Sequence, residues 1–216
     1  MASQAPGSTT VMRPTDYFGV PLAKLLSARI STVYSNFNAK RFFTSVQSSC
    51  EDLSLTQRVE LIADQLKINL PGNFARAIMI LHKIMGPENP KETGMFTNYY
   101  WLLPVGKFVE KYGLDHYDES IKAIEEITKR NTGEYAIRPF IRKYPGQAIR
   151  QMKIWARSDN FHLRRLVRDL GPNCLGLPNF ICSLRSQSRC STFFPYLRKT
   201  RSGLSGNQWP IILPII

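Results

Sequence analysis

Apolar residues recur at every third or fourth position along most of the chain. Four such series are Leu22, Leu25, Leu26, Ile30 and Val33; Val59, Ile62 and Leu66; Phe74, Ile78, Leu81 and Met85; and Val105, Phe108, Val109 and Tyr112. This spacing places each series on one face of an α-helix. Farther along, Ile121, Ile124 and Ile127 alternate with charged residues, which predicts a helix with one solvated face.

Turn and cap signals separate these series. The turn signals are Pro71-Gly72, Gly86-Pro87, Gly113 and Pro145-Gly146. Asn38 and Ser54 are placed to cap the helices that follow them. The pattern predicts about eight helices of about 10–15 residues with short connections, and no segment reads convincingly as a strand.

Short connections make consecutive helices antiparallel neighbours. We therefore expect an all-α fold, a degenerate α-solenoid of HEAT or armadillo type over residues 21–166. A compact helical bundle is the alternative that the pattern leaves open. Residues 1–20 are rich in Gly, Pro, Ser and Thr and predict a flexible N-terminal arm.

Composition fits one ordinary domain with a tail. The chain has 216 residues, of which 43% are hydrophobic and 21% charged, and this excludes wholesale disorder and collagen-like repeats. No uncharged apolar run reaches the length of a membrane span, and residues 1–15 lack the apolar core of a signal peptide. We expect a soluble intracellular protein.

The net charge of +13 is unevenly distributed. Residues 1–137 hold 15 Lys and Arg against 14 Asp and Glu, whereas residues 138–167 hold 8 against 1 and residues 168–216 hold 6 against 1. Positive charge concentrated in 30 residues favours a polyanionic partner.

The basic segment places its cations at helical spacing. They are Arg138, Arg142, Lys143, Arg150, Lys153, Arg157, Arg164 and Arg165. Because neighbouring helices of a solenoid present matching faces, we expect these side chains to merge into one cationic surface that binds phosphates. The alternative is a solvated face with scattered ion pairs, which we disfavour because Asp159 is the only acid within the segment.

Glu134 is the last acidic residue before the basic segment. It follows Asn131 and Thr132, two residues that can cap a helix. From the charge pattern alone, compensation of the dipole in the first turn is the favoured role of Glu134.

Several long stretches resemble one known family. TKRNTGEYAIRPFI (128–141) and MKIWARSDNFHLRRL (152–166), with VYSNFNAKRFF, VELIADQLKINLP and LPVGKFVEKYGLDHYDESIKAIEEIT upstream, are similar to the DNA alkylation repair family, and in particular to its AlkC-type branch. The likeness covers roughly residues 20–166.

The resemblance stops abruptly after residue 166. The family pattern would continue with SEGxRPxLPW and later RRSVANNLxD, whereas this chain reads VRDLGPNCLGLPNF and ends SGLSGNQWPIILPII. Shifting the codon frame recovers both motifs: residues 167–177 permit EGLRPKLPWA, and residues 202–215 permit RFVRKSVANNLAD. Asn173-Cys174 forces the Leu, and Trp209-Pro210 forces the Ala. We interpret residues 167–216 as a poorly ordered tail translated out of frame, which truncates the solenoid at its C-terminal side.

The tail carries three cysteines without the spacing of a metal site. Cys174, Cys182 and Cys190 lie at intervals of eight, whereas zinc ligands usually come in closely spaced pairs, and no His lies among them. We expect no metal and no cofactor.

The resemblance implies a HEAT-like solenoid that binds duplex DNA carrying alkylated bases and hydrolyses the N-glycosidic bond of cationic purines such as 3-methyladenine. It implies a monomer that works where the DNA lies, in the cytoplasm at the nucleoid or in a eukaryotic nucleus. Loss of the C-terminal part would impair that activity. A non-catalytic α-solenoid that binds DNA or protein partners is the alternative.

The resemblance also assigns residues. It makes Glu134 the first choice for the catalytic carboxylate, and it makes Arg164 and Arg165 phosphate ligands. Asp159 is a second candidate carboxylate, with a helix cap as its alternative role. We expect Trp101 and Trp155 to belong to the core, and the histidines His82, His116 and His162 to be structural.

Overall fold

The computed structural model describes residues 14–170, and all of the regular secondary structure in these residues is helical. The α-helices are α1 (Pro14–Tyr17), α2 (Val20–Val33), α3 (Ala39–Ser49), α4 (Leu55–Asn69), α5 (Phe74–Lys83), α6 (Leu103–Tyr112), α7 (Tyr117–Thr128), α8 (Glu134–Lys143), α9 (Pro145–Trp155) and α10 (Phe161–Asp169), and a 3-10 helix, η1 (Tyr100–Leu102), precedes α6. The structure has no strand within this part of the chain, as the periodicity predicts.

Local capping chemistry sets several helix starts. The side chain of Asn38 accepts a hydrogen bond from the Arg41 backbone N–H at 2.9 Å. Ser54 and Gln57 form a reciprocal capping box at the start of α4. Both predicted caps are confirmed, because each satisfies backbone donors that the first turn of a helix leaves unpaired.

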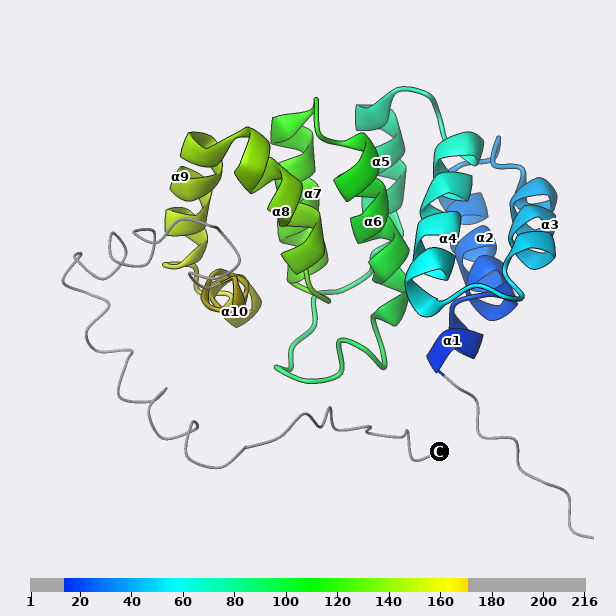
Figure 1. Cartoon of the computed structure of the whole chain (residues 1–216), viewed down its shortest axis with the longest axis horizontal. Coiled ribbons are helices and arrows are strands. Elements are labelled where there is room, and N and C mark those ends of the chain that lie inside the picture. Colours follow the sequence, from blue (N-terminus) through cyan, green and yellow to red (C-terminus); the bar gives the residue numbers. More distant parts are fainter. Residues whose placement is uncertain (1–13, 171–216) are drawn as a thin grey trace, which may run out of the picture.

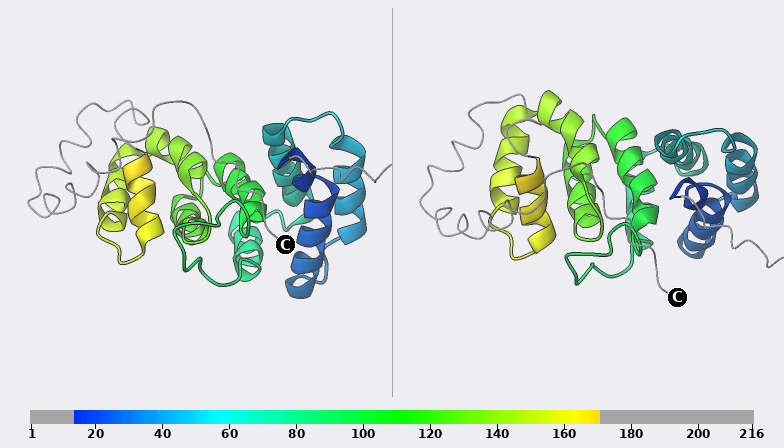
Figure 2. Two further views of the ribbon diagram at one scale, coloured as in Figure 1. Left: turned by 90° about the horizontal axis from the view of Figure 1, so that it is seen from below. Right: turned by 60° about the horizontal axis from the view of Figure 1, so that its bottom comes forward.

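The helices stack in two adjoining rows. Helices α4, α6 and α8 pack side by side in one row, and α2, α5, α7 and α10 pack in the other, with α3 against α2 and α4 at one end and α9 against α8 at the other (Figure 1). Further views show the same elongated succession of helices (Figure 2). This arrangement is a helical-repeat stack, so the predicted solenoid is confirmed and the compact bundle is excluded.

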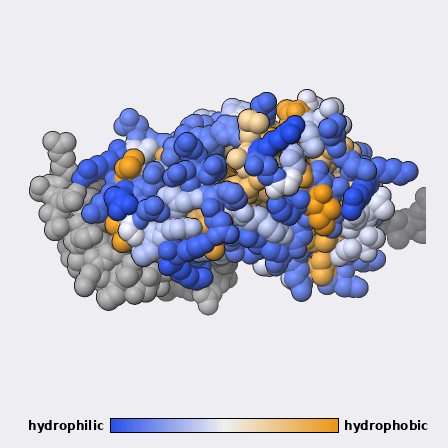
Figure 3. Space-filling model, turned by 90° about the horizontal axis from the view of Figure 1, so that it is seen from above, coloured by the Kyte–Doolittle hydropathy of each residue, from blue (hydrophilic) through white to orange (hydrophobic). Residues whose placement is uncertain are grey.

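The core lies between the two rows. Its largest fully buried side chains include Phe42, Phe108, Phe140 and Trp155. Trp101, at 2% exposure, and Trp155, at 1%, are both core residues, as expected. The surface seen from above is mainly hydrophilic, with separate small apolar patches (Figure 3). No helix in residues 14–170 combines the length and apolar character needed to cross a bilayer.

A glycine makes the turn between α6 and α7. A Cβ atom on Gly113 would lie 2.3 Å from Ser120 Oγ and 2.7 Å from the Val109 carbonyl oxygen. The Ser120 hydroxyl occupies this space and donates to the Gly113 carbonyl at 2.8 Å. The turn predicted at Gly113 is therefore confirmed, and close approach of the two helices is the reason for the glycine.

Ordered structure begins earlier than the sequence suggests. The predicted arm ends at residue 20, but α1 begins at Pro14, and Phe18 is buried at 6% exposure. The buried Arg58 guanidinium anchors this segment by donating to the Thr15 carbonyl at 3.0 Å. At the other end α10 continues through Asp169, and Leu170 is fully buried. The rest of the predicted tail, with its three cysteines, lies outside the described residues.

Candidate functional site

Glu134 is the first residue of α8 and sits close against α7. A Cβ atom on the preceding Gly133 would lie 2.5 Å from Thr128 Oγ1 and 2.8 Å from Ile124 Cγ2, so only glycine permits this approach. The Glu134 side chain is 27% exposed and pairs with the Arg138 guanidinium, one turn farther along α8, at 2.5 Å. The pair leaves the carboxylate accessible at one end of the stack.

Asn131 does not cap α8, which corrects that expectation. The N-cap residue is Gly133, and no side chain caps the helix. Asn131 is fully buried, and its amide donates to the Met95 carbonyl at 3.2 Å and the Tyr99 carbonyl at 2.7 Å. The Thr132 hydroxyl accepts a hydrogen bond from the Glu134 backbone N–H at 3.3 Å. Of the two residues expected to cap α8, only Thr132 therefore makes a side-chain contact with the first residue of the helix. The amide of Asn131 is used instead to hold a distant loop.

Arg165 joins Glu134 and Arg138 at this end of the stack. Its guanidinium donates to the Asn131 carbonyl at 3.0 Å and lies 3.7 Å from Asp169. Burial lowers the pKa of Arg165, whereas the charges of Asp169 and Glu134 act in the opposite direction. The structure thus brings together one predicted carboxylate and two predicted phosphate ligands. We name Glu134, Arg138 and Arg165 the carboxylate cluster.

Arg164, in the first turn of α10, extends back onto the turn between α9 and α10. Its guanidinium donates to the Ser158 carbonyl at 2.6 Å and to the Asp159 carbonyl at 2.8 Å. Asn160, and not Asp159, caps α10, because the Asn160 side chain accepts from the His162 backbone N–H at 3.0 Å. The alternative role of Asp159 as a cap is therefore wrong, and its role as a carboxylate stays a prediction.

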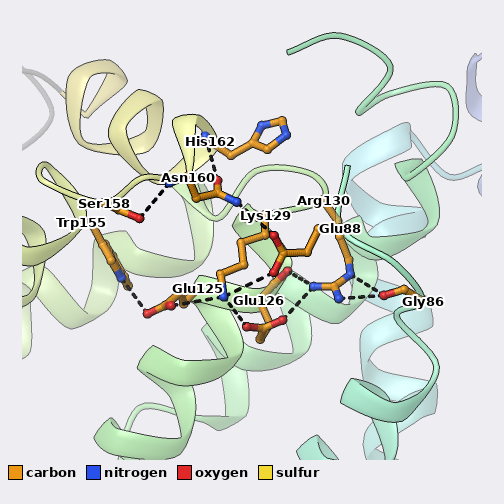
Figure 4. A network of polar contacts seen from close by, with 10 residues as sticks. All are labelled: Gly86, Glu88, Glu125, Glu126, Lys129, Arg130, Trp155, Ser158, Asn160 and His162. Atoms are coloured by element: carbon orange, nitrogen blue, oxygen red, sulfur yellow. Dashed lines mark hydrogen bonds and ion pairs between the residues drawn. The ribbon is translucent and has the colours of Figure 1, made fainter. Parts of the chain in front are cut away.

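A shallow hollow of about 490 Å³ lies beside this turn. Its lining includes the predicted residues Lys153, Arg157 and Asp159, together with Trp155 and Glu125. The indole N–H of Trp155 donates to the Glu125 carboxylate at 2.9 Å (Figure 4). Glu134 does not line the hollow, so the two candidate carboxylates occupy different places.

The other predicted cations lie toward the opposite end of α8 and α9. Lys143 ends α8 and forms an ion pair with Asp115, in the turn between α6 and α7, at 2.5 Å. This contact raises the pKa of Lys143 and lowers the pKa of Asp115. Arg142 is exposed beside Lys143, and Arg150 is exposed on α9. Helix α8 has ten residues and is about 15 Å long, so it separates these cations from Glu134.

Two expectations about the basic segment need correction. Its cations divide between the two ends of helices α8 and α9 instead of forming one cluster. Acidic partners are also more numerous than the segment suggests, since folding brings in Asp115 from 28 residues away, Glu134 pairs with Arg138, and Asp169 pairs with Arg165. Linear charge counting missed Asp115 because a tertiary contact supplies it, whereas Glu134 and Asp169 lie just outside the segment, one helical turn from their partners.

A polar network lies at the C-terminal end of α7, a few residues before Glu134 in the chain (Figure 4). Arg130 is buried, donates to the Gly86 carbonyl at 2.7 Å, and pairs with Glu126 at 2.9 Å. Lys129 pairs with Glu126 at 2.7 Å and approaches Glu88 at 3.6 Å. These contacts fix the connection between α5 and α6 against the C-terminal end of α7. The sequence analysis did not predict that Lys129 and Arg130 anchor this connection. Their position as two adjacent cations just after the predicted helix was the signal that could have indicated it.

His162 belongs to the same region and is structural, as expected. It is fully buried, its Nε2 lies 3.1 Å from the Asn89 carbonyl, and its Nδ1 has no hydrogen-bond partner. His82 and His116 are exposed, and the ring of His116 stacks on Phe74 with centroids 5.0 Å apart. The 3.1 Å contact between Nε2 of His162 and the Asn89 carbonyl requires that Nε2 carry the proton of the neutral His162 ring.

Acidification is expected to destabilise the fold through His162. Burial, assisted by the charge of Arg165, lowers the pKa of this ring, and the Asn89 carbonyl, Glu92 and Glu88 oppose the shift only in part. The unfolded chain therefore binds more protons below the ordinary pKa of 6.5, and the free energy of unfolding falls as the pH drops below that value. We expect His162→Gln to flatten this dependence between about pH 6.5 and pH 5, above the range of most carboxylates.

Urea unfolding followed by far-UV circular dichroism at each pH measures this effect. The matched control is His116→Gln, which alters an exposed ring and should leave the pH dependence as in the parent chain. Equal slopes for the parent chain and His162→Gln would exclude the proposed role of the buried ring.

Comparisons with known proteins support the fold. No protein-family model matches the chain. The chain is 30% identical over 155 residues to the uncharacterized protein YhaZ of Bacillus subtilis, a match that covers 71% of this chain and 41% of YhaZ. Among solved structures, the Pseudomonas fluorescens alkylpurine DNA glycosylase AlkC, bound to DNA containing an abasic site analog, matches with a TM-score of 0.64 and 23% identity over 73% of this chain and 42% of AlkC.

The structural match shows that this chain, over the 73% that it covers, adopts the helical-repeat fold of AlkC. The resemblance read from the sequence is therefore confirmed for the fold. The chain spans about two fifths of the length of both proteins. Within residues 14–170 no group of three or more His, Cys, Asp or Glu side chains is arranged to hold a metal ion.

Proposed function

We propose that this chain acts in DNA repair, by binding duplex DNA that carries alkylated bases and hydrolysing the N-glycosidic bond of a cationic alkylated purine such as 3-methyladenine. The observation that carries the proposal is the carboxylate cluster, which stands on a fold shared with an alkylpurine DNA glycosylase. The chain would work as a monomer in the compartment that holds the DNA.

The chemistry requires little acid catalysis. An N-alkylated purine is already cationic, so when the bond between C1′ and the base nitrogen breaks, the electron pair goes to the base, which leaves as a neutral molecule. The sugar becomes an oxocarbenium-like cation. A fixed carboxylate stabilises this charge and orients a water molecule, which adds to C1′ and releases a proton. Glu134 is suited to this role because Arg138 holds its side chain in place and the carboxylate is still partly exposed.

The cations would position the DNA. Guanidinium groups bind phosphates through paired N–H donors, and Arg138 and Arg165 flank the carboxylate. Arg164, Lys153 and Arg157 surround the neighbouring hollow and turn. Arg142, Lys143 and Arg150 would contact a more distant stretch of the backbone.

Binding to DNA should depend steeply on salt. A surface that neutralises about four phosphates would lose about 100-fold in affinity between about 50 and about 200 mM salt, because bound counterions are released. Fluorescence anisotropy with a methylated duplex and an unmodified duplex of the same sequence measures this dependence. Salt-insensitive or absent binding to both duplexes would contradict the proposal and favour a solenoid that binds protein partners.

One observation favours binding without excision as a second candidate function. The ion pair with Arg138 already neutralises Glu134, and a neutralised carboxylate stabilises a sugar cation less well. This candidate predicts salt-sensitive binding that does not distinguish methylated from unmodified DNA and releases no base.

A further inference from the structure

The connection between α5 and η1 forms a tight turn with an exposed aromatic ring in its middle. The backbone N–H groups of Thr97 and Asn98 both donate to the Gly94 carbonyl, at 3.2 and 2.8 Å. Gly94 has a φ of +85°, a conformation that glycine adopts without strain. Phe96 lies between the two ends of this turn, and 58% of its surface is exposed.

Hydrogen bonds from two buried side chains, Asn131 and His162, hold the turn and its connection in place. The Asn131 amide binds the carbonyls of Met95 and Tyr99, one on each side of Phe96. Earlier in the same connection, the Asn89 N–H donates to the Lys129 carbonyl at 3.0 Å, and His162 contacts the Asn89 carbonyl. The exposed ring of Phe96 is therefore carried by a fixed backbone.

The same contacts place the turn beside the carboxylate cluster. Asn131, which holds Met95, is three residues before Glu134, and its carbonyl accepts from Arg165. The connection between α5 and α6 and helix α10 both lie at the lower side of the stack (Figures 1 and 2). The turn and the candidate carboxylate thus share one anchoring residue.

A second exposed aromatic side chain lies next to Glu134. Tyr135 is 62% exposed, and the Arg138 guanidinium lies 5.0 Å from the centroid of its ring. Among the described residues, the large exposed hydrophobic side chains elsewhere are Tyr17, Ile68, Met79 and Ile154, of which only Tyr17 is aromatic. Two of these three exposed aromatic rings, Phe96 and Tyr135, thus lie on the segments that Asn131 joins at the carboxylate cluster.

An exposed phenylalanine on a fixed turn is a suitable partner for a nucleic-acid base. Every base offers a flat face, and stacking on an aromatic side chain changes affinity by about 5- to 150-fold per base. A turn that is already ordered loses little conformational freedom on binding. The guanidinium groups of Arg138 and Arg165 beside it suit a phosphate-bearing partner.

We propose that Phe96 stacks on an unstacked base of the DNA held at the carboxylate cluster. This inference rests on the proposed function and adds a residue that recognises distorted DNA. An intact duplex keeps its bases stacked on one another, so Phe96 contributes little to its binding. A duplex with a missing or displaced base offers a free face, and Phe96 then contributes to affinity and selectivity.

The test compares an intact duplex with the same duplex carrying a tetrahydrofuran abasic analogue next to 2-aminopurine. Phe96→Ala is expected to weaken binding to the abasic duplex about tenfold and to leave the salt slope unchanged, because it removes no charge. Phe96→Trp should restore binding. Met79→Ala, which truncates an exposed side chain on α5, is the matched control and should bind like the parent chain. The parent chain should alter 2-aminopurine fluorescence more than Phe96→Ala does.

Two outcomes would overturn the inference, and they are distinguishable. If the parent chain binds with the expected salt dependence and Phe96→Ala matches it in affinity and fluorescence on both duplexes, the stacking role is wrong and the proposed function stands. If the parent chain shows no salt-sensitive binding to any duplex, the proposed function fails, and the role of Phe96 fails with it. Far-UV circular dichroism verifies that each variant is folded.

Discussion

Glu134→Gln is expected to lower the rate of base release from methylated duplex DNA by about 100-fold or more, the size of effect seen when one electrostatic contact to a transition state is removed. The amide has nearly the shape of the carboxylate but carries no charge, so it cannot stabilise the sugar cation. Folding should be almost unaffected, since a partly exposed ion pair one helical turn apart contributes only about 0.3–0.5 kcal/mol. DNA affinity should therefore be maintained.

The control for this variant is Glu110→Gln. Glu110 is also partly exposed and paired within its own helix, with Lys107 at 2.8 Å, but it lies on α6. Chromatographic detection of released methylated bases, with binding measured in parallel, separates chemistry from affinity. A chain whose codons from residue 167 are read in the alternative frame is assayed beside the given one. Equal excision by an active parent chain and its Glu134→Gln variant would remove Glu134 from the mechanism.

Trp155→Ala is expected to lower the free energy of unfolding by about 3–5 kcal/mol. Trp155 is 1% exposed at the end of α9, and its indole N–H donates to the Glu125 carboxylate at 2.9 Å. Truncation leaves a cavity beneath α9 and removes the hydrogen bond from Glu125. Since α9 packs against α8 and α10, loss of this anchor should loosen the end of the stack that carries the predicted cations.

Urea unfolding followed by far-UV circular dichroism measures this loss. Trp155→Phe keeps much of the packing but not the hydrogen bond, and it should be less destabilising than Trp155→Ala. The neighbouring Ile154→Ala is the matched control, because Ile154 is 63% exposed and its truncation should change stability by no more than about 0.5 kcal/mol. Equal stabilities for Trp155→Ala and Ile154→Ala would show that the indole does not anchor α9.

Much of the fold could be predicted from the sequence because helices are encoded locally. The spacing of Leu22, Leu26 and Ile30 defines a buried face within one helix, and the caps at Asn38 and Ser54 act within one turn. Short connections then leave antiparallel stacking as the arrangement that covers those faces. The two tryptophans were expected in the core because tryptophan is more often buried than exposed as a stacking platform. The resemblance extended the local reading of the helices to the whole stack.

The site was less predictable because its contacts are long-range. Asn131 is a residue type that often caps helices, yet its side-chain amide donates to the carbonyls of Tyr99 and Met95, 32 and 36 residues away. The basic segment appeared to lack acidic partners until folding brought Asp115 to Lys143. Phe96 lies in a connection without periodicity, where no pattern distinguishes an exposed ring from a buried one.

The sequence by itself determined the helices, their order, their buried faces and the resemblance that directs attention to Glu134, because periodicity and capping depend on neighbours within a few residues. Only the tertiary structure decided which charges pair, that the cations divide between two ends of α8 and α9, and that the turn carrying Phe96 lies beside Glu134. Charge pairing and loop placement depend on distances through space, and these are set when the two rows of helices pack together.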